Sequence, residues 1–407
     1  MSIDEAVGTD LPPERRRDSA DDAPGVEPIL DDIAAAADVV PRRRDLTVVR
    51  RIAIAAWVAF MVYEYLVSGL AFDRTRLLLL LCLGMLAATI GRRKATTVII
   101  DWLPFAAILL LYDWTRNVAV WLGMPTHWHL AVDIDQAMFG VSPTAWLQGQ
   151  LKQAGPPWWE IITSVIYMSY FIIPYAVAAV LWLRDRAAWR RYAACFVATT
   201  FLALIGYSLL PAAPPWAAAK CTSEQVVGHP HDPSCMYAPT PDPGGGLLGP
   251  VTPSHPGAAP YVERISARGW EYLNVPAASE LLQIGQGKAN LVAAIPSLHA
   301  GLTMLLALFM WPRVRALGKT LFMGYALAMA FTLVYTAEHY VIDVLLGWAL
   351  AASVIVVYHW IDRRWLRPRS ERLAAADQTG SDQTGPGQTV PDDEADGPVS
   401  PSAVAPA

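Results

Sequence analysis

The sequence predicts an all-α membrane protein, a polytopic bundle of about eight transmembrane helices with a disordered tail at each end. Of its 407 residues, 54% are hydrophobic and only 16% are charged, whereas an average soluble domain has about 25% charged residues. Several apolar segments approach the roughly 20 residues that a helix needs to cross the hydrocarbon core. The predicted spans are residues 48–70, 76–90, 98–122, 160–183, 190–210, 293–311, 320–337 and 339–361.

Both ends of the chain are predicted to be disordered. Residues 1–47 mix acidic residues, prolines and two arginine clusters and lack the apolar core of a signal peptide. Residues 370–407 form an acidic tail, with six carboxylates and no base after Arg372. This tail alone outweighs the net charge of −5, so the overall acidity says nothing about the membrane domain, residues 48–369. No nucleic-acid partner is expected, and the oligomeric state is left open.

The distribution of Lys and Arg predicts the orientation, because basic residues in short loops stay on the cytoplasmic side. With eight spans, all the basic clusters fall on one face, which predicts a multi-pass cell-membrane protein with both termini in the cytoplasm. Three segments then face outward: residues 123–159, the Pro/Gly-rich loop 211–292 and the junction around Glu338. Within the first, residues 129–147 are interpreted as a membrane-parallel or re-entrant element, either covering a lipid cleft or serving only as an interfacial anchor.

Two of the four cysteines share the outer loop. Cys82 and Cys195 fall within spans, whereas Cys221 and Cys235 lie in the loop 211–292. An oxidising outer compartment would permit a disulfide between the loop pair, which is our hypothesis. Two unpaired loop cysteines remain the alternative, because sequence alone does not fix pairing.

Two histidine segments carry the predicted chemistry. The first, NLVAAIPSLHAG, places Pro296 in the first turn of a helix and His299 about one turn in. The second, HYVID, places His339 and Asp343 at positions i and i+4 on one helix face. Asp343 can accept a hydrogen bond from one imidazole nitrogen and leave the other as a nucleophile. His339 is therefore the predicted nucleophile, and His299 the acid and base that serves the leaving and accepting oxygens.

A phosphate suits this site better than a metal ion. Alternating spans bring both histidine segments to the outer face as helix N-termini, whose N–H groups and partial positive charge attract anions. The same dipoles repel a cation, so phosphoryl transfer ranks above a zinc site and no metal is expected. Ser297 is predicted to hydrogen-bond a phosphate oxygen.

These motifs resemble a known family. PSLHAG followed by HYVID looks like the second and third signature motifs of the type 2 phosphatidic acid phosphatase superfamily. Together with YSLLPAAPPW at residues 207–216 they are similar to its inositol phosphorylceramide synthase branch, over a catalytic core of about residues 98–361. The resemblance implies that His339 is the nucleophile, that His299 transfers protons, that no metal or cofactor takes part, and that phosphoinositol passes from a phospholipid donor to a lipid or glycolipid acceptor.

The chain departs from the phosphatases of this superfamily in its cations. It has no Lys and Arg-Pro motif before PSLHAG, and position 333 is Leu where those enzymes carry Arg. Another cation must neutralise the transferring group, and Arg116 is the first candidate, with Asp113 holding it or binding an inositol hydroxyl. A structural Asp113–Arg116 ion pair is the alternative. Arg264 and Arg268 are interpreted as solvated loop charges.

Further residues complete the predicted site. Lys288 is the second-choice cation, Asn290 lies beside the PSLHAG helix, and Tyr207 is within possible reach of the substrate. The leading function is a headgroup transferase of lipid metabolism. A lipid or polyprenyl phosphate phosphatase using the same histidines is the nearest alternative, and a proton-relay transporter or a zinc hydrolase ranks lower.

Overall fold

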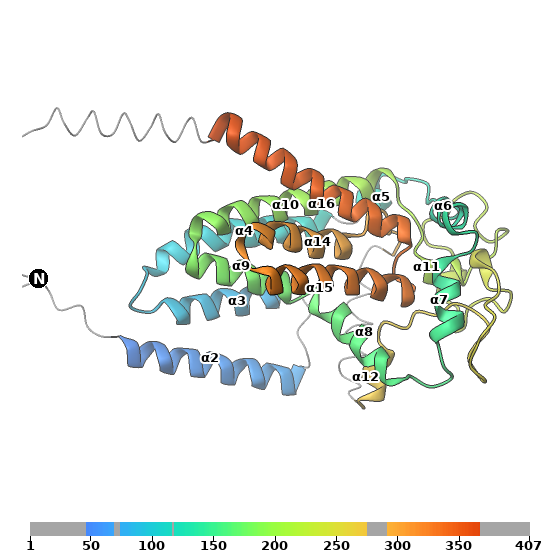
Figure 1. The fold of residues 1–407 in the computed structure, drawn as a ribbon, viewed down its shortest axis with the longest axis horizontal. Coiled ribbons are helices and arrows are strands. Elements are labelled where there is room, and N and C mark those ends of the chain that lie inside the picture. Colours follow the sequence, from blue (N-terminus) through green and yellow to red (C-terminus); the bar gives the residue numbers. More distant parts are fainter. Residues whose placement is uncertain (1–45, 69–73, 116–117, 275–290, 367–407) are drawn as a thin grey trace, which may run out of the picture.

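The computed structural model describes residues 46–68, 74–115, 118–274 and 291–366, and all its regular secondary structure is helical (Figure 1). The predicted disordered tails lie outside these residues, as do Arg116, Lys288 and Asn290. The longer helices are α2 (Thr47–Ser68), α3 (Arg74–Thr89), α4 (Ala95–Thr115), α8 (Trp158–Ser169), α9 (Ile173–Arg184), α10 (Arg186–Leu209), α14 (Leu298–Met310), α15 (Ala316–Tyr335) and α16 (Val341–Ile361). The shorter ones are α5 (Val118–Trp121), α6 (Leu130–Phe139), α7 (Pro143–Leu151), α11 (Pro215–Ala218) and α12 (Arg268–Tyr272), with 3-10 turns at Ser234–Tyr237, Gly246–Leu248 and Trp311–Arg313 and a π-helical turn at Asp362–Leu366.

Four helices in the described part of the chain are long and apolar enough to cross a membrane: Ala95–Tyr112, Arg186–Leu209, Ala316–Tyr335 and Val341–Trp365. A bent pair, α8 with α9, raises the number to five. The eight predicted spans are therefore not all shown, although each predicted segment contains helix. Helix α14 has 13 residues, which at 1.5 Å per residue is roughly 20 Å, short of the hydrocarbon thickness of about 30 Å.

The predicted span 160–183 is not one straight helix. Helices α8 and α9 meet at an angle of 50°, and Pro174 occupies the first turn of α9. Because proline lacks an N–H and its ring clashes with the preceding turn, it belongs at a helix start. Two residues of this break, Tyr170 and Phe171, lie in the site described below.

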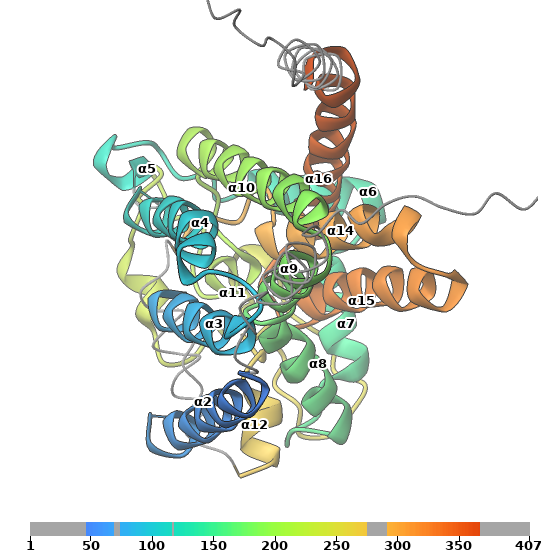
Figure 2. The same cartoon turned by 90° about the vertical axis from the view of Figure 1, so that its left-hand side faces the viewer.

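Helix α14 is packed among α10, α15 and α16 (Figure 2). Its contact with α16 is unusually close: a Cβ atom on Gly347 would lie 2.3 Å from the carbonyl oxygen of Ser297. The Ser297 N–H donates a hydrogen bond to the Asp343 carbonyl at 2.9 Å. The small residue at 347 thus lets the two histidine segments lie side by side at the start of their helices.

One end of the bundle carries a folded cap, which comprises residues 124–157 and 211–267 and includes α6, α7 and α11 (right in Figure 1). The cap has an apolar core of its own, built around Trp128, Val262 and a run of buried alanines. Backbone bridges join His127 to Ala212 and Ala212 to Ala293, so the cap is tied to the chain that leads into α14.

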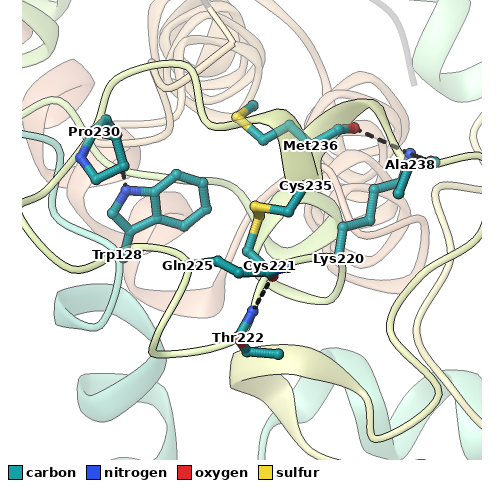
Figure 3. The surroundings of a disulfide bond; sticks show 9 residues. All are labelled: Trp128, Lys220, Cys221, Thr222, Gln225, Pro230, Cys235, Met236 and Ala238. Carbon is teal, nitrogen blue, oxygen red and sulfur yellow. Dashed lines mark hydrogen bonds between the residues drawn. A yellow bond between two sulfur atoms is a disulfide. The ribbon is translucent and has the colours of Figure 1, made fainter.

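The structure pairs Cys221 with Cys235 as a disulfide within this cap, with Cα atoms 5.2 Å apart (Figure 3). Around it, the Lys220 ammonium donates to the Ala238 carbonyl at 2.8 Å, and the Trp128 indole N–H donates to the Pro230 carbonyl at 3.0 Å. Cys82 and Cys195 are free thiols. The described part of the Pro/Gly-rich loop therefore folds as an ordered cover over one end of the bundle.

Candidate active site

His299 lies at the start of α14. Ser297 is the N-cap of this helix, and its hydroxyl oxygen accepts a hydrogen bond from the Ala300 N–H at 3.3 Å. The expected boundary is wrong by two residues: Pro296 precedes the helix, and His299 is its second residue instead of lying one turn in. Helix α14 nevertheless presents His299 at its N-terminal end, where backbone N–H groups and the helix dipole favour an anion.

His339 and Asp343 are brought together at the start of α16. The sequence predicted that His339 lies in the first turn of this helix. The helix begins only at Val341, so His339 lies just ahead of it. The pair still meets, with His339 Nδ1 3.4 Å from Asp343 Oδ2, because the Tyr340 N–H donates to that same carboxylate oxygen at 2.9 Å. Asp343 is completely buried. It can therefore fix the tautomer of His339 and leave Nε2 as the reactive nitrogen.

The two imidazoles lie close to each other. Their ring centroids lie 5.8 Å apart with planes inclined by 56°. Residues at the α8–α9 break surround His299: the Tyr170 ring lies at 4.0 Å, the Tyr167 ring is stacked at 5.2 Å, and Phe171 meets it edge-on at 6.0 Å. The sequence prediction missed these aromatic neighbours; Pro174 was the signal that the apolar run is interrupted there.

Arg264 is not the solvated loop charge that the sequence suggested. Its guanidinium donates Nε and Nη2 hydrogen bonds to the two carboxylate oxygens of Glu338, at 2.9 and 2.7 Å. Ser266 donates a third, at 2.6 Å. Burial alone would raise the pKa of Glu338, but the Arg264 charge and these hydrogen bonds bring it below its usual value. An ion pair therefore stands directly beside His339.

Arg268 is likewise paired. It contacts the buried carboxylate of Glu160 at 3.3 Å and donates to the Gln153 carbonyl at 3.0 Å. The Tyr335 hydroxyl donates to the same Glu160 oxygen at 2.8 Å. This second ion pair ties the cap to α8 and α15, so the prediction of a solvated charge is wrong here too.

The other predicted substrate residues fare differently. Tyr207, on α10, is buried, is hydrogen-bonded to the backbone of Leu298 and lies close to Asp343 and Tyr170. It therefore borders the site, as expected from its position in the sequence. The Asp113 side chain, like Arg116, Lys288 and Asn290, lies outside the described part of the structure.

Asp135, on α6 of the cap, is a site residue that the sequence prediction did not identify. Its side chain is fully buried, and its two oxygens accept the Val341 and Ile342 N–H groups at 2.9 and 3.0 Å. It thus caps α16 from another segment of the chain and fixes the turn that carries His339. Burial, together with the nearby Asp343, raises the pKa of Asp135 to about 6, although the two backbone hydrogen bonds oppose the shift.

This raised pKa predicts a pH-dependent contribution to stability. A carboxyl whose pKa is higher in the folded state stabilises that state fully below its ordinary pKa of about 4, and the contribution is lost as the pH rises through about 6. The stability advantage of the wild type over Asp135→Asn should therefore fall by about 2 kcal/mol between pH 4 and 7. Chemical unfolding of both proteins in detergent measures this difference, with the exposed Asp133→Asn as the control. A difference independent of pH would contradict the assignment.

Comparisons with known proteins show to which family this chain belongs. The model of the PAP2 superfamily matches residues 131–357, more than half of the chain, a stretch that contains both histidines, Asp343 and Asp135. The chain is also similar to the phosphoinositol dihydroceramide synthase of Bacteroides thetaiotaomicron, with 24% identity over 250 residues that cover 60% of this chain and 71% of the relative. No solved structure matches the chain. The chain belongs to the PAP2 superfamily of membrane enzymes.

Proposed function

We propose that this protein is a membrane phosphotransferase that moves a phospho-alcohol headgroup, phosphoinositol, from a phospholipid to a lipid or glycolipid acceptor through a phosphohistidine on His339. The observation that carries the proposal is the arrangement of His339, held at Nδ1 by the buried Asp343, with the His299 ring centroid 5.8 Å from its own. At this separation the two imidazoles can contact the same phosphoryl group, one as nucleophile and one as proton donor.

The first half-reaction forms a covalent intermediate. Nε2 of His339 attacks the phosphorus of the donor phosphodiester, and the bond between phosphorus and the diacylglycerol oxygen breaks. The leaving oxygen takes a proton from His299, so that diacylglycerol departs as a neutral alcohol. Asp343 holds the tautomer of His339 that exposes Nε2 and stabilises the positive charge that develops on the ring.

The second half-reaction reverses these roles. A hydroxyl of the acceptor lipid attacks phosphorus, its proton passes to the now neutral His299, and the bond from phosphorus to His339 Nε2 breaks. The products are a lipid that carries the phospho-alcohol and the original enzyme. With a lipid phosphate as donor and water in place of the acceptor, the same residues would act as a phosphatase.

The relative from Bacteroides thetaiotaomicron supports phosphoinositol as the group transferred, since that protein is a phosphoinositol dihydroceramide synthase. The aromatic side chains of the α8–α9 break beside His299 also suit the neighbourhood of a lipid substrate, because they offer apolar area next to the reacting group.

We place the site on the outer face of the cell membrane and both termini in the cytoplasm. The helix junctions at the end of the bundle away from the cap carry basic clusters, among them Arg92–Lys94 and Arg184–Arg191, and such loops stay on the cytoplasmic side. The disulfide-bonded cap then faces an oxidising compartment, which suits its disulfide.

The test is to incubate the full chain in vesicles with phosphatidylinositol that is labelled in its inositol ring, with and without dihydroceramide as acceptor. The proposal expects diacylglycerol and a new labelled lipid that depends on the acceptor. Labelled water-soluble inositol phosphate in place of the new lipid would mean hydrolysis of the donor phosphodiester and would overturn the assignment as a transferase, as would the formation of neither product.

A further inference from the structure

A guanidinium lies among the residues that surround both histidines. Arg264 is bound to Glu338, the neighbour of His339 in the chain, through two hydrogen bonds. A further side-chain hydrogen bond joins Arg264 to Tyr167, whose ring is stacked on His299. Glu338 in turn lies near enough to His299 to interact with it electrostatically. Arg264 therefore contacts one residue beside each predicted catalytic histidine: Glu338, next to His339, and Tyr167, next to His299.

The Arg264 side chain is held in place and is partly exposed. Besides its bonds to Glu338, Arg264 stacks on the Trp216 ring, with Cζ 4.8 Å from the centroid. The cap segment that carries it is tied to the end of α15 by the bond from the Ile265 N–H to the Thr336 carbonyl at 3.3 Å. About a quarter of the Arg264 side chain, 26%, is exposed, against 6% for Glu338. A group that is both oriented and accessible can meet a ligand without further ordering.

Other cations in the cap and next to it are engaged away from the histidines. Lys152 is almost completely buried against Glu263, and Lys220 donates to the carbonyls of Met236 and Ala238. Arg268 is held by Glu160. These pairings tie cap segments to one another or to helices, whereas Arg264 alone among these four contacts residues adjacent to His299 and His339.

We infer that Arg264 binds the phosphodiester of the donor lipid and neutralises the charge on its non-bridging oxygens during transfer. The inference rests on the proposed function and names the cation that this chemistry needs. Guanidinium suits the task because its planar fork can bond two oxygens of one phosphoryl group and it stays charged throughout. Arg264 makes and breaks no covalent bond; Glu338 acts as its positioning residue.

A purely structural ion pair is the competing explanation, and a double variant separates the two. Removing Arg264 alone leaves the Glu338 carboxylate buried without its partner, which destabilises the fold whatever Arg264 does in catalysis. Removing both charges, in Arg264→Gln with Glu338→Gln, relieves that penalty. If Arg264 is structural, stability and activity return together in the double variant. If it binds phosphate, only stability returns.

The experiment measures thermal stability, phosphatidylinositol turnover and inhibition by orthovanadate, a mimic of the transferring phosphoryl group, for the full chain in vesicles. We expect Arg264→Gln to lower the rate by about 10²- to 10³-fold and to weaken vanadate inhibition, with both defects persisting in the double variant. Arg264→Lys should recover only part of the rate, because it keeps the charge but loses the fork. Arg268→Gln, which removes the Arg268–Glu160 ion pair, is the matched control and should keep normal vanadate inhibition.

Two results would overturn the inference: recovery of rate in the double variant, or unchanged vanadate inhibition in Arg264→Gln. Failure of the proposed function is distinguishable, because then the wild-type protein itself would form neither the new lipid nor a phosphoenzyme. If only the inference fails, the wild type forms both, and Arg264→Gln behaves like Arg268→Gln.

Discussion

Replacing His339 by Ala should abolish turnover and the covalent phosphoenzyme, with a rate loss of at least about 10⁴-fold, as is usual when a nucleophile is removed. The physical reason is that the site has no second route to the intermediate: His299 is placed among aromatic rings as the proton-transfer group, and Asp343 is buried behind His339. Rapid-quench measurements with donor labelled in phosphorus report both quantities at once.

His359 offers the matched control for this variant. It lies near the other end of the same helix, α16, and is exposed, so His359→Ala removes an imidazole without touching the site. We expect it to keep normal rates. Near-normal turnover in His339→Ala, with the protein folded, would show that the nucleophile has been assigned wrongly.

Asp343→Asn should fold normally and still lower the rate by about 10³- to 10⁴-fold, the scale seen when an orienting carboxylate is replaced by an amide. An amide oxygen can still accept the Tyr340 N–H, which now bonds Asp343 at 2.9 Å. What is lost is the negative charge that stabilises the imidazolium, because the amide oxygen that faces His339 Nδ1 is neutral. Single-turnover kinetics should show slow phosphoenzyme formation with little change in donor binding.

Asp133→Asn, an exposed neutralisation on α6, controls for the loss of a carboxylate near the site. If Asp343→Asn instead raised the donor KM and left the chemical step unchanged, Asp343 would be a substrate-binding group and not the residue that orients His339.

The parts of the site that follow from short-range sequence patterns were predictable. Positions 339 and 343 are four residues apart, so a helical turn brings them together wherever the helix starts, and the pairing survives although α16 begins only at Val341. The helical character of the apolar segments follows for the same reason, because it is a local periodicity.

Long-range contacts were not predictable in this way. Asp135 reaches Val341 across more than two hundred residues of sequence, and Arg264 reaches Glu338 from the cap. A lone Asp in a Trp-containing segment or a lone Arg in a Pro-rich loop looks like an ordinary surface charge, and only the folded cap shows that each is bonded next to a histidine. Arg116, the first candidate from the sequence, and the side chain of its predicted partner Asp113 lie outside the described residues, so that pairing stays a prediction.

The eight predicted spans are not all shown, and at two of them the hydrophobicity of the segment and the length of its helix disagree. The segment 293–311 is apolar throughout, but the cap backbone and Ser297 delay the helix to Leu298, and Trp311–Arg313 closes it. Likewise, hydrophobicity runs through Tyr170–Ile172 without a break, although the chain turns there by 50°. Composition shows how apolar a segment is, whereas N-cap residues and prolines determine where its helix begins and ends.

The most direct test of the account is to trap the intermediate and find the residue that carries it. The wild-type chain in vesicles is mixed with phosphatidylinositol labelled in phosphorus, quenched in alkali, where phosphohistidine survives, and digested for mass spectrometry. The account predicts phosphoinositol on the peptide that contains His339, absent from His339→Ala and accumulating when the acceptor lipid is withheld. A label on any other residue, or full turnover with no covalent label at any time point, would contradict it.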